Sequence, residues 1–235
     1  MTAAPSRQDQ LATLLAIGRV IPVITINALE EGVPLARALV VGGVRLLEIT
    51  LRTKVGMQAA EAIMRAVPEA VVGIGTVLTP ADMARAVASG AQFALSPGAT
   101  PDLLDAAAAA PIPFLPGIAT ASELMEAMVR GFDTAKFFPA STAGGIPALK
   151  ALAGPFPSAR FCPTGGITEE NASTWLSQPN VVAVGGSWLT PAADVAARNW
   201  DAITSRARAV GVVQSQVALI GFQGGDGSVT QPGRR

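Results

Sequence analysis

Short β-branched runs alternate with alanine-rich stretches of helical spacing along the chain, and this alternation constrains the fold more than any other feature. Most runs begin about 20 to 25 residues apart, which leaves room for a strand, a loop and a helix in each repeat. Strands that alternate with helices form a parallel sheet, so the pattern predicts an α/β protein. The strand-like runs lie at 20–26, 46–51, 71–77, 93–98, 114–119, 134–140, 160–166 and 181–189.

The same residue types mark several predicted helix ends. Thr79, Thr100 and Thr190 each precede a proline, which predicts a hydroxyl N-cap followed by proline at the first helical position. Thr168 precedes two glutamates, whose negative charge suits a helix N-terminus. The clearest helix-like segments are 28–43, 79–90 and 120–131, and they are predicted to end on the glycines Gly42, Gly90 and Gly131.

Eight strand–helix repeats within about 200 residues fit a (β/α)₈ TIM barrel, although a doubly wound open sheet gives the same alternation. Glu48, Thr50 and Arg52 alternate along one run and need a shared polar interior, which favours the barrel. Residues 1–18 are predicted to form an extra N-terminal helix over one end. We expect residues 1–210 to form a single domain and the glycine-rich segment 211–235 to be a flexible tail.

Composition removes several classes of function. Lys plus Arg equals Asp plus Glu at 17 each, which argues against nucleic-acid or membrane-surface binding. The single cysteine, Cys162, permits no internal disulfide and is interpreted as a packed hydrophobe. No secretory signal or apolar run of about 20 residues is present, so a cytoplasmic protein is expected.

The chain contains no histidine and no tyrosine. Histidine triads and histidine-ligated zinc are therefore excluded, and acid–base work at neutral pH falls to carboxylates, lysine or water. No spacing of two carboxylates points to a metal site.

One of only three lysines, Lys136, lies in a strand-like run beside Phe137 and Phe138. It either extends its ammonium to solvent or serves as an uncharged amine nucleophile, helped by burial and a neighbouring arginine. Lys54 and Lys150 fall in loop-like or helix-like segments, and this contrast favours the nucleophile.

Glu48 and Arg52 are two further candidates from one run. They form an ion pair with each other, or Glu48 transfers protons at a carbon centre while Arg52 binds a substrate carboxylate. Thr76 and Thr164 are polar residues at the ends of other strands.

Two glycine pairs, 165–166 and 185–186, follow the last two strand-like runs, and Ser187 follows the second pair. Such pairs occur at simple turns, but in barrels this position commonly holds a phosphate on backbone N–H groups. The paired occurrence favours phosphate binding.

Together these segments resemble the bacterial 2-keto-3-deoxy-6-phosphogluconate (KDPG) aldolases, the class I, Schiff-base aldolases of the Entner–Doudoroff pathway. The likeness extends from about residue 12 to about residue 208. It rests on "GGVRLLEITLRT" (42–53), "GIGTVL" (73–78), "ALSPG" (94–98), "KFFPA" (136–140), "KALAGPF" (150–156), "RFCPTGGI" (160–167) and "GGSWL" (185–189).

The resemblance implies a homotrimer of TIM barrels that acts on a phosphorylated keto acid without a cofactor or metal. It implies that Lys136 forms the Schiff base and that Glu48 shuttles protons. The remaining implied roles are binding of the pyruvoyl group by Arg52, Thr76 and Thr164, shaping of the pocket by Pro97 and Phe138, and binding of the phosphate by Gly165, Gly166, Gly186 and Ser187.

Other functions remain open at this point. A sugar-phosphate isomerase or epimerase would use Glu48 as a base and Lys136 only for electrostatic stabilisation. A phosphate-ligand sensor would bind without turnover. Within the aldolases, cleavage of 2-keto-4-hydroxyglutarate (KHG) is a plausible second activity, because its pyruvoyl end is the same.

Overall fold

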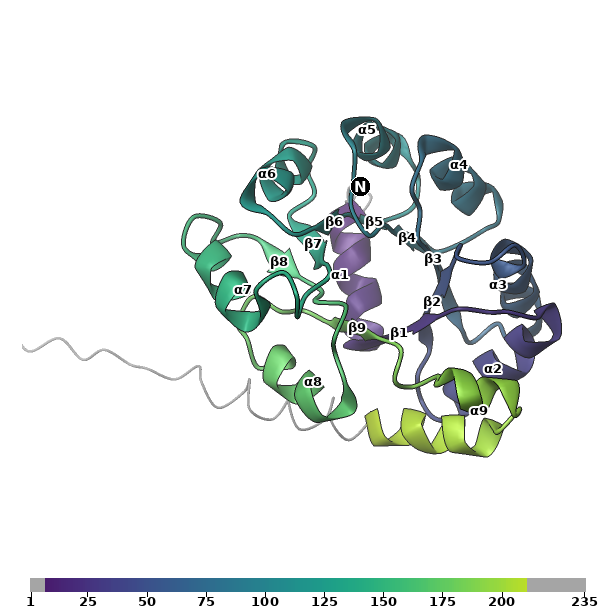
Figure 1. Ribbon diagram of the computed structural model, residues 1–235. Helices are drawn as coiled ribbons and strands as arrows, with labels where there is room; N and C mark the ends of the chain where they lie inside the picture. The colour runs from purple at the N-terminus through teal and green to yellow at the C-terminus, as the bar shows by residue number, and fades with distance from the viewer. Residues whose placement is uncertain (1–6, 211–235) are drawn as a thin grey trace, which may run out of the picture.

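A computed structural model describes residues 7–210. The chain is an α/β protein with a curled parallel sheet inside a ring of helices (Figure 1). The strands are β1 Val20–Ile24, β2 Leu46–Thr50, β3 Val71–Gly75, β4 Phe93–Leu95, β5 Phe114–Leu115, β6 Gly117–Ile118, β7 Thr134–Phe137, β8 Arg160–Phe161 and β9 Val184–Gly186. The helices are α1 Arg7–Ile17, α2 Leu29–Val41, α3 Gly56–Ala66, α4 Pro80–Ala88, α5 Pro101–Ala109, α6 Ala121–Val129, α7 Gly145–Ala153, α8 Glu169–Leu176 and α9 Ala192–Ala196, and residues 200–210 are also helical.

The strands hydrogen-bond in the orders β5-β4-β3-β2-β1-β9 and β6-β7-β8. The run predicted as one strand at 114–119 is two short strands, because Pro116 has no N–H to donate and interrupts the ladder. On either side of it, β5 pairs with β4 and β6 pairs with β7. Isolated bridges join Phe161 to Val181 and Thr164 to Gly185.

Every strand-like run ends earlier in the structure than the sequence predicts. For example, β4 stops at Leu95 rather than at residue 98, and β8 stops at Phe161 rather than at residue 166. Pro163 cannot donate to a ladder, and Gly165 and Gly166 have positive φ values of 97° and 76°. The residues beyond these strand ends are therefore loops at the carboxyl edge of the sheet.

Two apolar clusters hold the fold together. The larger lies between the sheet and the surrounding helices, and the smaller lies inside the curl of the sheet. Leu11 and Leu15 of α1 join the smaller cluster together with inward-facing residues such as Leu46 and Phe93. Helix α1 crosses the middle of the ring in Figure 1, so it covers one end of the sheet, as predicted for the N-terminal segment. Residues 1–6 and 211–235, including the predicted tail, lie outside the described residues.

The predicted N-caps are confirmed at two of the three Thr–Pro pairs. Thr79 accepts a hydrogen bond from the Asp82 N–H at 3.1 Å, and Thr100 accepts one from the Leu103 N–H at 3.3 Å. The prediction is wrong at Thr190, because α9 starts later and has Pro191 at its N-cap position without a side-chain cap. The Thr190 hydroxyl is therefore not used to begin a helix.

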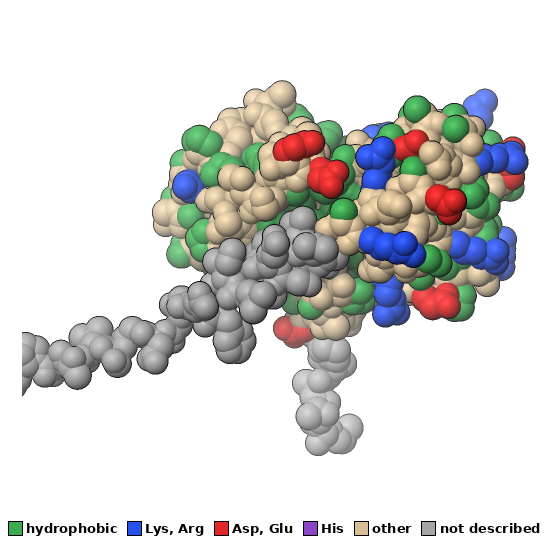
Figure 2. Space-filling view, turned by 90° about the horizontal axis from the view of Figure 1, so that it is seen from below, with side chains coloured by type: hydrophobic (Ala, Val, Ile, Leu, Met, Phe, Trp, Pro, Cys, Tyr) green, Lys and Arg blue, Asp and Glu red, His purple; other side chains and the backbone are tan. Residues whose placement is uncertain are grey.

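Basic and acidic side chains are interspersed with apolar ones on the face drawn in Figure 2. None of the helices within residues 7–210 is both long and apolar enough to cross a membrane.

Candidate active site

A buried lysine–carboxylate pair lies at the centre of the candidate site. Lys136 Nζ on β7 is 2.8 Å from Glu48 Oε1 and 3.1 Å from Oε2 on β2. The two side chains are only 4% and 2% exposed. Lys136 therefore does not extend to solvent, and each charge is buried against the other, as burial of an ionised group requires.

The neighbouring strands hold this pair in place. The Lys136 N–H donates to the Pro116 carbonyl oxygen at 2.8 Å, and Lys136 pairs with Gly117 in the ladder between β6 and β7. On the other side, a Cβ added to Gly75 of β3 would overlap the Glu48 carboxylate. A glycine is needed there because any side chain would displace the carboxylate.

The pair carries no net charge, and its proton can move along the hydrogen bond. Transfer from Nζ to Glu48 leaves a neutral amine and a carboxylic acid, which are the nucleophile and the acid of carbonyl chemistry. The Phe138 ring centroid lies 5.8 Å from Nζ, within the range of a cation–π contact. The charged group beside Lys136 is thus the Glu48 carboxylate rather than the arginine predicted from the sequence.

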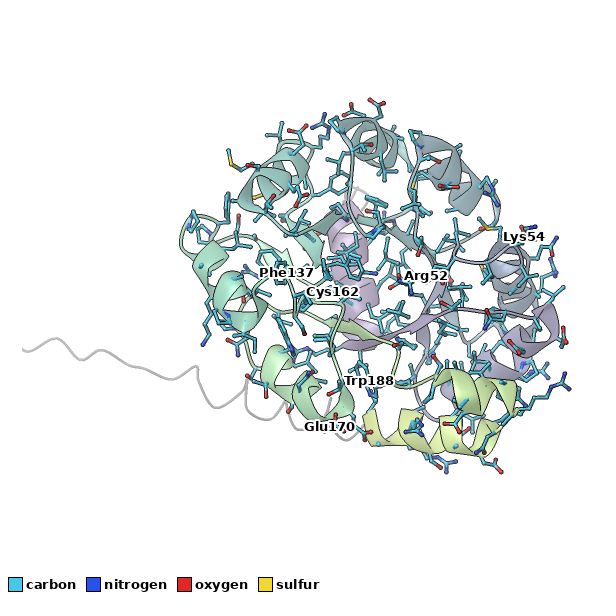
Figure 3. The ribbon with its side chains drawn as sticks, in the orientation of Figure 1. Arg52, Lys54, Phe137, Cys162, Glu170 and Trp188 are labelled. Atoms are coloured by element: carbon cyan, nitrogen blue, oxygen red, sulfur yellow. The ribbon has the colours of Figure 1, made fainter. Side chains whose placement is uncertain are left out.

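Arg52 follows the end of β2 in an exposed turn. Its guanidinium has no ion-pair or hydrogen-bond partner among residues 7–210, so the possible ion pair with Glu48 is not formed. Figure 3 shows Arg52 inside the ring of helices, whereas Lys54 lies at the outer edge beside α3. An arginine without a partner is free to bind an anionic ligand.

The active-site cavity, of about 240 Å³, brings most of the predicted binding residues together at the carboxyl edge of the sheet. Arg52 is the only ionisable residue of its lining. Val23 and Ile167 also line it and were missed, because an apolar residue at a strand end resembles any core residue. The predicted residues in the lining are Arg52, Phe138, Thr164, Gly165, Gly166, Gly186 and Ser187.

The glycine segments line this cavity with unpaired backbone donors. The N–H groups of Gly165, Gly166 and Ser187 donate to no acceptor within residues 7–210. At Gly165 and Gly166 the left-handed φ values turn the chain sharply after β8. Successive N–H groups in such a turn form a concave site that suits an anion.

Four predicted residues do not line this cavity. Lys136 and Glu48 are absent from its lining, although Phe138, whose ring lies beside Lys136, is part of it. Thr76, with φ of 61°, lines a separate outer cavity of about 360 Å³, which it shares with Arg52 and Lys54. Pro97 does not line the active-site cavity, and its carbonyl group lies against Gly117.

Two further buried residues, Ser96 and Cys162, lie near the site. The sequence did not single out Ser96, a fully buried residue within the "ALSPG" motif, whose Oγ accepts a hydrogen bond from the Gly117 N–H at 3.1 Å. Burial raises the pKa of the Cys162 thiol to about 12, with the Lys136 charge acting in the opposite direction. Cys162 is therefore a protonated, packed side chain, as the sequence indicates.

These features define a class of site: a buried lysine amine paired with a carboxylate, next to Phe138 of a cavity lined by one free arginine and unpaired N–H groups. Such a site suits covalent catalysis on an anionic carbonyl compound. Within residues 7–210, no three Cys, Asp or Glu side chains are placed to hold one metal ion.

The chain belongs to the KDPG and KHG aldolase family, whose model matches residues 11–206. The KHG/KDPG aldolase of Escherichia coli (strain K12) is 52% identical over 196 residues, which are 83% of this chain and 92% of that protein.

Two solved structures are also similar. One is the KDPG aldolase from Legionella pneumophila, solved "with pyruvate captured at low pH as a covalent carbinolamine intermediate". It has a TM-score of 0.83 and 48% identity, over 85% of this chain and 97% of that chain. The 2-keto-3-deoxy-6-phosphogluconate aldolase of Zymomonas mobilis ZM4, solved with 3-phosphoglycerate, has a TM-score of 0.81 and 42% identity. It covers 87% of this chain and 96% of that chain.

Proposed function

We propose that the protein is a class I aldolase that cleaves KDPG to pyruvate and glyceraldehyde 3-phosphate through a Schiff base on Lys136. The observation that carries the proposal is the buried contact of 2.8 Å between Lys136 Nζ and Glu48 Oε1. Family membership and the names of the similar proteins support it.

The reaction begins when Nζ passes a proton to Glu48. The neutral amine attacks the C2 ketone and forms a carbinolamine, which loses water with the proton that Glu48 returns. The product is an iminium ion that withdraws electrons from the C3–C4 bond. Because the iminium is the electron sink, the cleavage requires no cofactor or metal.

Glu48 then takes the proton of the C4 hydroxyl, directly or through a water molecule. The C3–C4 bond breaks, its electron pair forms an enamine, and glyceraldehyde 3-phosphate leaves. Glu48 returns the proton to C3, and water hydrolyses the resulting iminium to pyruvate and free Lys136.

The anionic ends of the substrate are assigned to the rest of the cavity. Arg52 binds the carboxylate through its planar guanidinium. By resemblance to the family, the pyruvoyl group is held by Thr164 of the cavity wall and by Thr76, which shares the outer cavity with Arg52. Pro97 and Phe138 shape the pocket around it. The phosphate binds at Gly165, Gly166, Gly186 and Ser187, where the N–H groups of Gly165, Gly166 and Ser187 are unpaired donors within residues 7–210.

A second substrate follows from the family. The similar E. coli protein is a KHG/KDPG aldolase. KHG presents the same pyruvoyl end to Lys136 and Arg52, so we propose that it is cleaved to pyruvate and glyoxylate by the same steps.

The proposal includes the assembly. We propose a closed (β/α)₈ barrel, supported by the pairing of β4 with β5 and of β6 with β7 and by the bridge between Thr164 and Gly185. Residues 1–210 would form this single domain, with residues 211–235 as a tail. By resemblance to the family, we propose a homotrimer in the cytoplasm that binds neither nucleic acid nor membrane.

The deciding experiment is the intact mass of the protein after incubation with pyruvate and sodium borohydride, followed by peptide mapping. We expect one pyruvate-derived adduct, on Lys136, and none on a Lys136→Met variant. An isomerase, an epimerase or a phosphate sensor would form no adduct under conditions that trap a known Schiff-base aldolase. That result would overturn the proposal.

A further inference from the structure

A second cavity, here named the side cavity, adjoins the active-site cavity. It has a volume of about 320 Å³ and lies between the end of β1 and the segment that leads from β9 into α9. The two cavities share Val23, Arg52 and Ser187, so they lie side by side. The side cavity is lined by Val23, Thr25, Asn27, Arg52, Ser187, Thr190, Pro191, Ala192 and Val195.

Most polar side chains of the side cavity have no internal partner. Asn27, Ser187 and Thr190 make no side-chain hydrogen bond to any group within residues 7–210. The hydroxyls of Thr79 and Thr100, in contrast, are used to cap helices. Because α9 begins after Pro191, the Thr190 hydroxyl is left free at the cavity wall.

Thr25 offers an acceptor in the same wall. Its Oγ1 lies 3.1 Å from Thr50 Oγ1, and the Thr50 hydroxyl donates to the Ile24 carbonyl oxygen at 3.0 Å. Thr25 is therefore the donor of the pair, and its oxygen can still accept a hydrogen bond from a ligand.

The chemistry of this lining matches hydroxyl groups better than a second anion. Arg52 is the only ionisable side chain of both cavities, so an anion in the side cavity would compete for it with one in the active-site cavity. The amide of Asn27 and the hydroxyl of Thr190 are neutral groups that both donate and accept, and the Thr25 hydroxyl can accept. An uncharged hydroxyl group of a ligand can donate hydrogen bonds to such groups and accept hydrogen bonds from them.

We propose that the side cavity binds hydroxyl groups of the aldehyde half of the aldol reaction, with Asn27 and Thr190 as the residues that determine this specificity. The inference rests on the proposed function. In the addition direction, C3 of the pyruvate enamine on Lys136 forms a bond to the aldehyde carbon. The aldehyde oxygen takes a proton from Glu48, and hydrolysis releases the new keto acid and the amine.

The test compares two unphosphorylated aldehydes as partners of pyruvate: D-erythrose, which carries hydroxyls, and propanal, which carries none. The measured quantity is the ratio of their kcat/KM values, with propanal as the internal reference. We expect Asn27→Leu and Thr190→Val each to lower this ratio about 3- to 10-fold, the effect of one neutral hydrogen bond. Thr174→Val makes the same chemical change on the exposed face of α8 and should leave the ratio as in the wild type.

An unchanged ratio in both cavity variants, or no measurable addition to D-erythrose by the wild type, would overturn the inference. Failure of the proposed function has a different signature. In that case the wild type would form no borohydride-stable adduct with pyruvate and would add pyruvate to neither aldehyde.

Discussion

Gly75→Ala should disrupt the candidate site, although Gly75 is not one of the residues assigned to substrate binding. The added Cβ would overlap Glu48 Oε1 and would lie 2.6 Å from Cγ and 2.7 Å from Cδ, against an ordinary contact of 3.4–4 Å. Gly75 is in the middle of the sheet and pairs with Thr50. Since the backbone there is held on both sides, the Glu48 side chain has to move, by about 1 Å.

Two magnitudes follow from this shift. Overpacking of a buried position costs about 1–3 kcal/mol of unfolding free energy. For a domain of this size, about 2 kcal/mol lowers the Tm by roughly 4–8 °C. Displacement of a catalytic group by about 1 Å can cost about 100-fold in rate, so we expect kcat for KDPG cleavage to fall about 100-fold.

The assay couples pyruvate formation from KDPG to lactate dehydrogenase and corrects each rate for the folded fraction measured by circular dichroism. Gly154→Ala is the matched control, because its nearest neighbour would be Ala151 O at 3.9 Å and its φ is −61°. It should keep wild-type kcat and, at most, gain slightly in stability. A Gly75→Ala protein with wild-type kcat would refute the reasoning that Glu48 must be held against Lys136.

Four further predictions concern single side chains. Lys136→Met should keep the fold but abolish KDPG cleavage, because it has no nucleophilic nitrogen; substantial residual turnover would reject the assigned role. Glu48→Gln should still trap pyruvate with borohydride but exchange its methyl protons about 100-fold or more slowly by NMR, and a wild-type exchange rate would remove Glu48 from the mechanism. Arg52→Lys should raise the KM for pyruvate in that exchange about tenfold, because an ammonium cannot bind a carboxylate in bidentate fashion; an unchanged KM would place the carboxylate elsewhere. Burial raises the pKa of the Cys162 thiol to about 12, so at about pH 8 it should react with a thiol reagent only after unfolding, and rapid reaction of the folded protein would contradict this.

The parallel α/β architecture was predictable from the sequence because its signals are local. The Thr79–Pro80 and Thr100–Pro101 pairs mark helix starts through contacts with residues only a few positions away. The strand ends were predicted too far along the chain, as after Leu95 and Phe161, because the proline and glycine residues that follow were included in the strand-like runs although they end the ladder.

The residues of the candidate site could be predicted from the sequence, but their arrangement in space could not. Lys136 and Glu48 are 88 positions apart, and no local pattern shows that their side chains are in contact. The room that Gly75 leaves for Glu48 depends on the neighbouring strand, so the glycine gives no signal of its own. Thr190 was predicted to be an N-cap because it precedes Pro191. The observed start of α9 depends on how the segment after β9 packs, and sequence spacing does not specify that packing.

The absence of histidine has a physical consequence for the proposed mechanism. The Lys136–Glu48 pair is neutral as a whole, so its burial leaves no net charge under the cavity to repel an anionic substrate. The attraction then comes from Arg52 and from backbone N–H groups, none of which changes its protonation during the reaction. Proton transfer and substrate binding are thereby assigned to separate groups. Glu48 can hand one proton from Nζ to the leaving water, and later another from the C4 hydroxyl to C3, without disturbing the groups that hold the substrate.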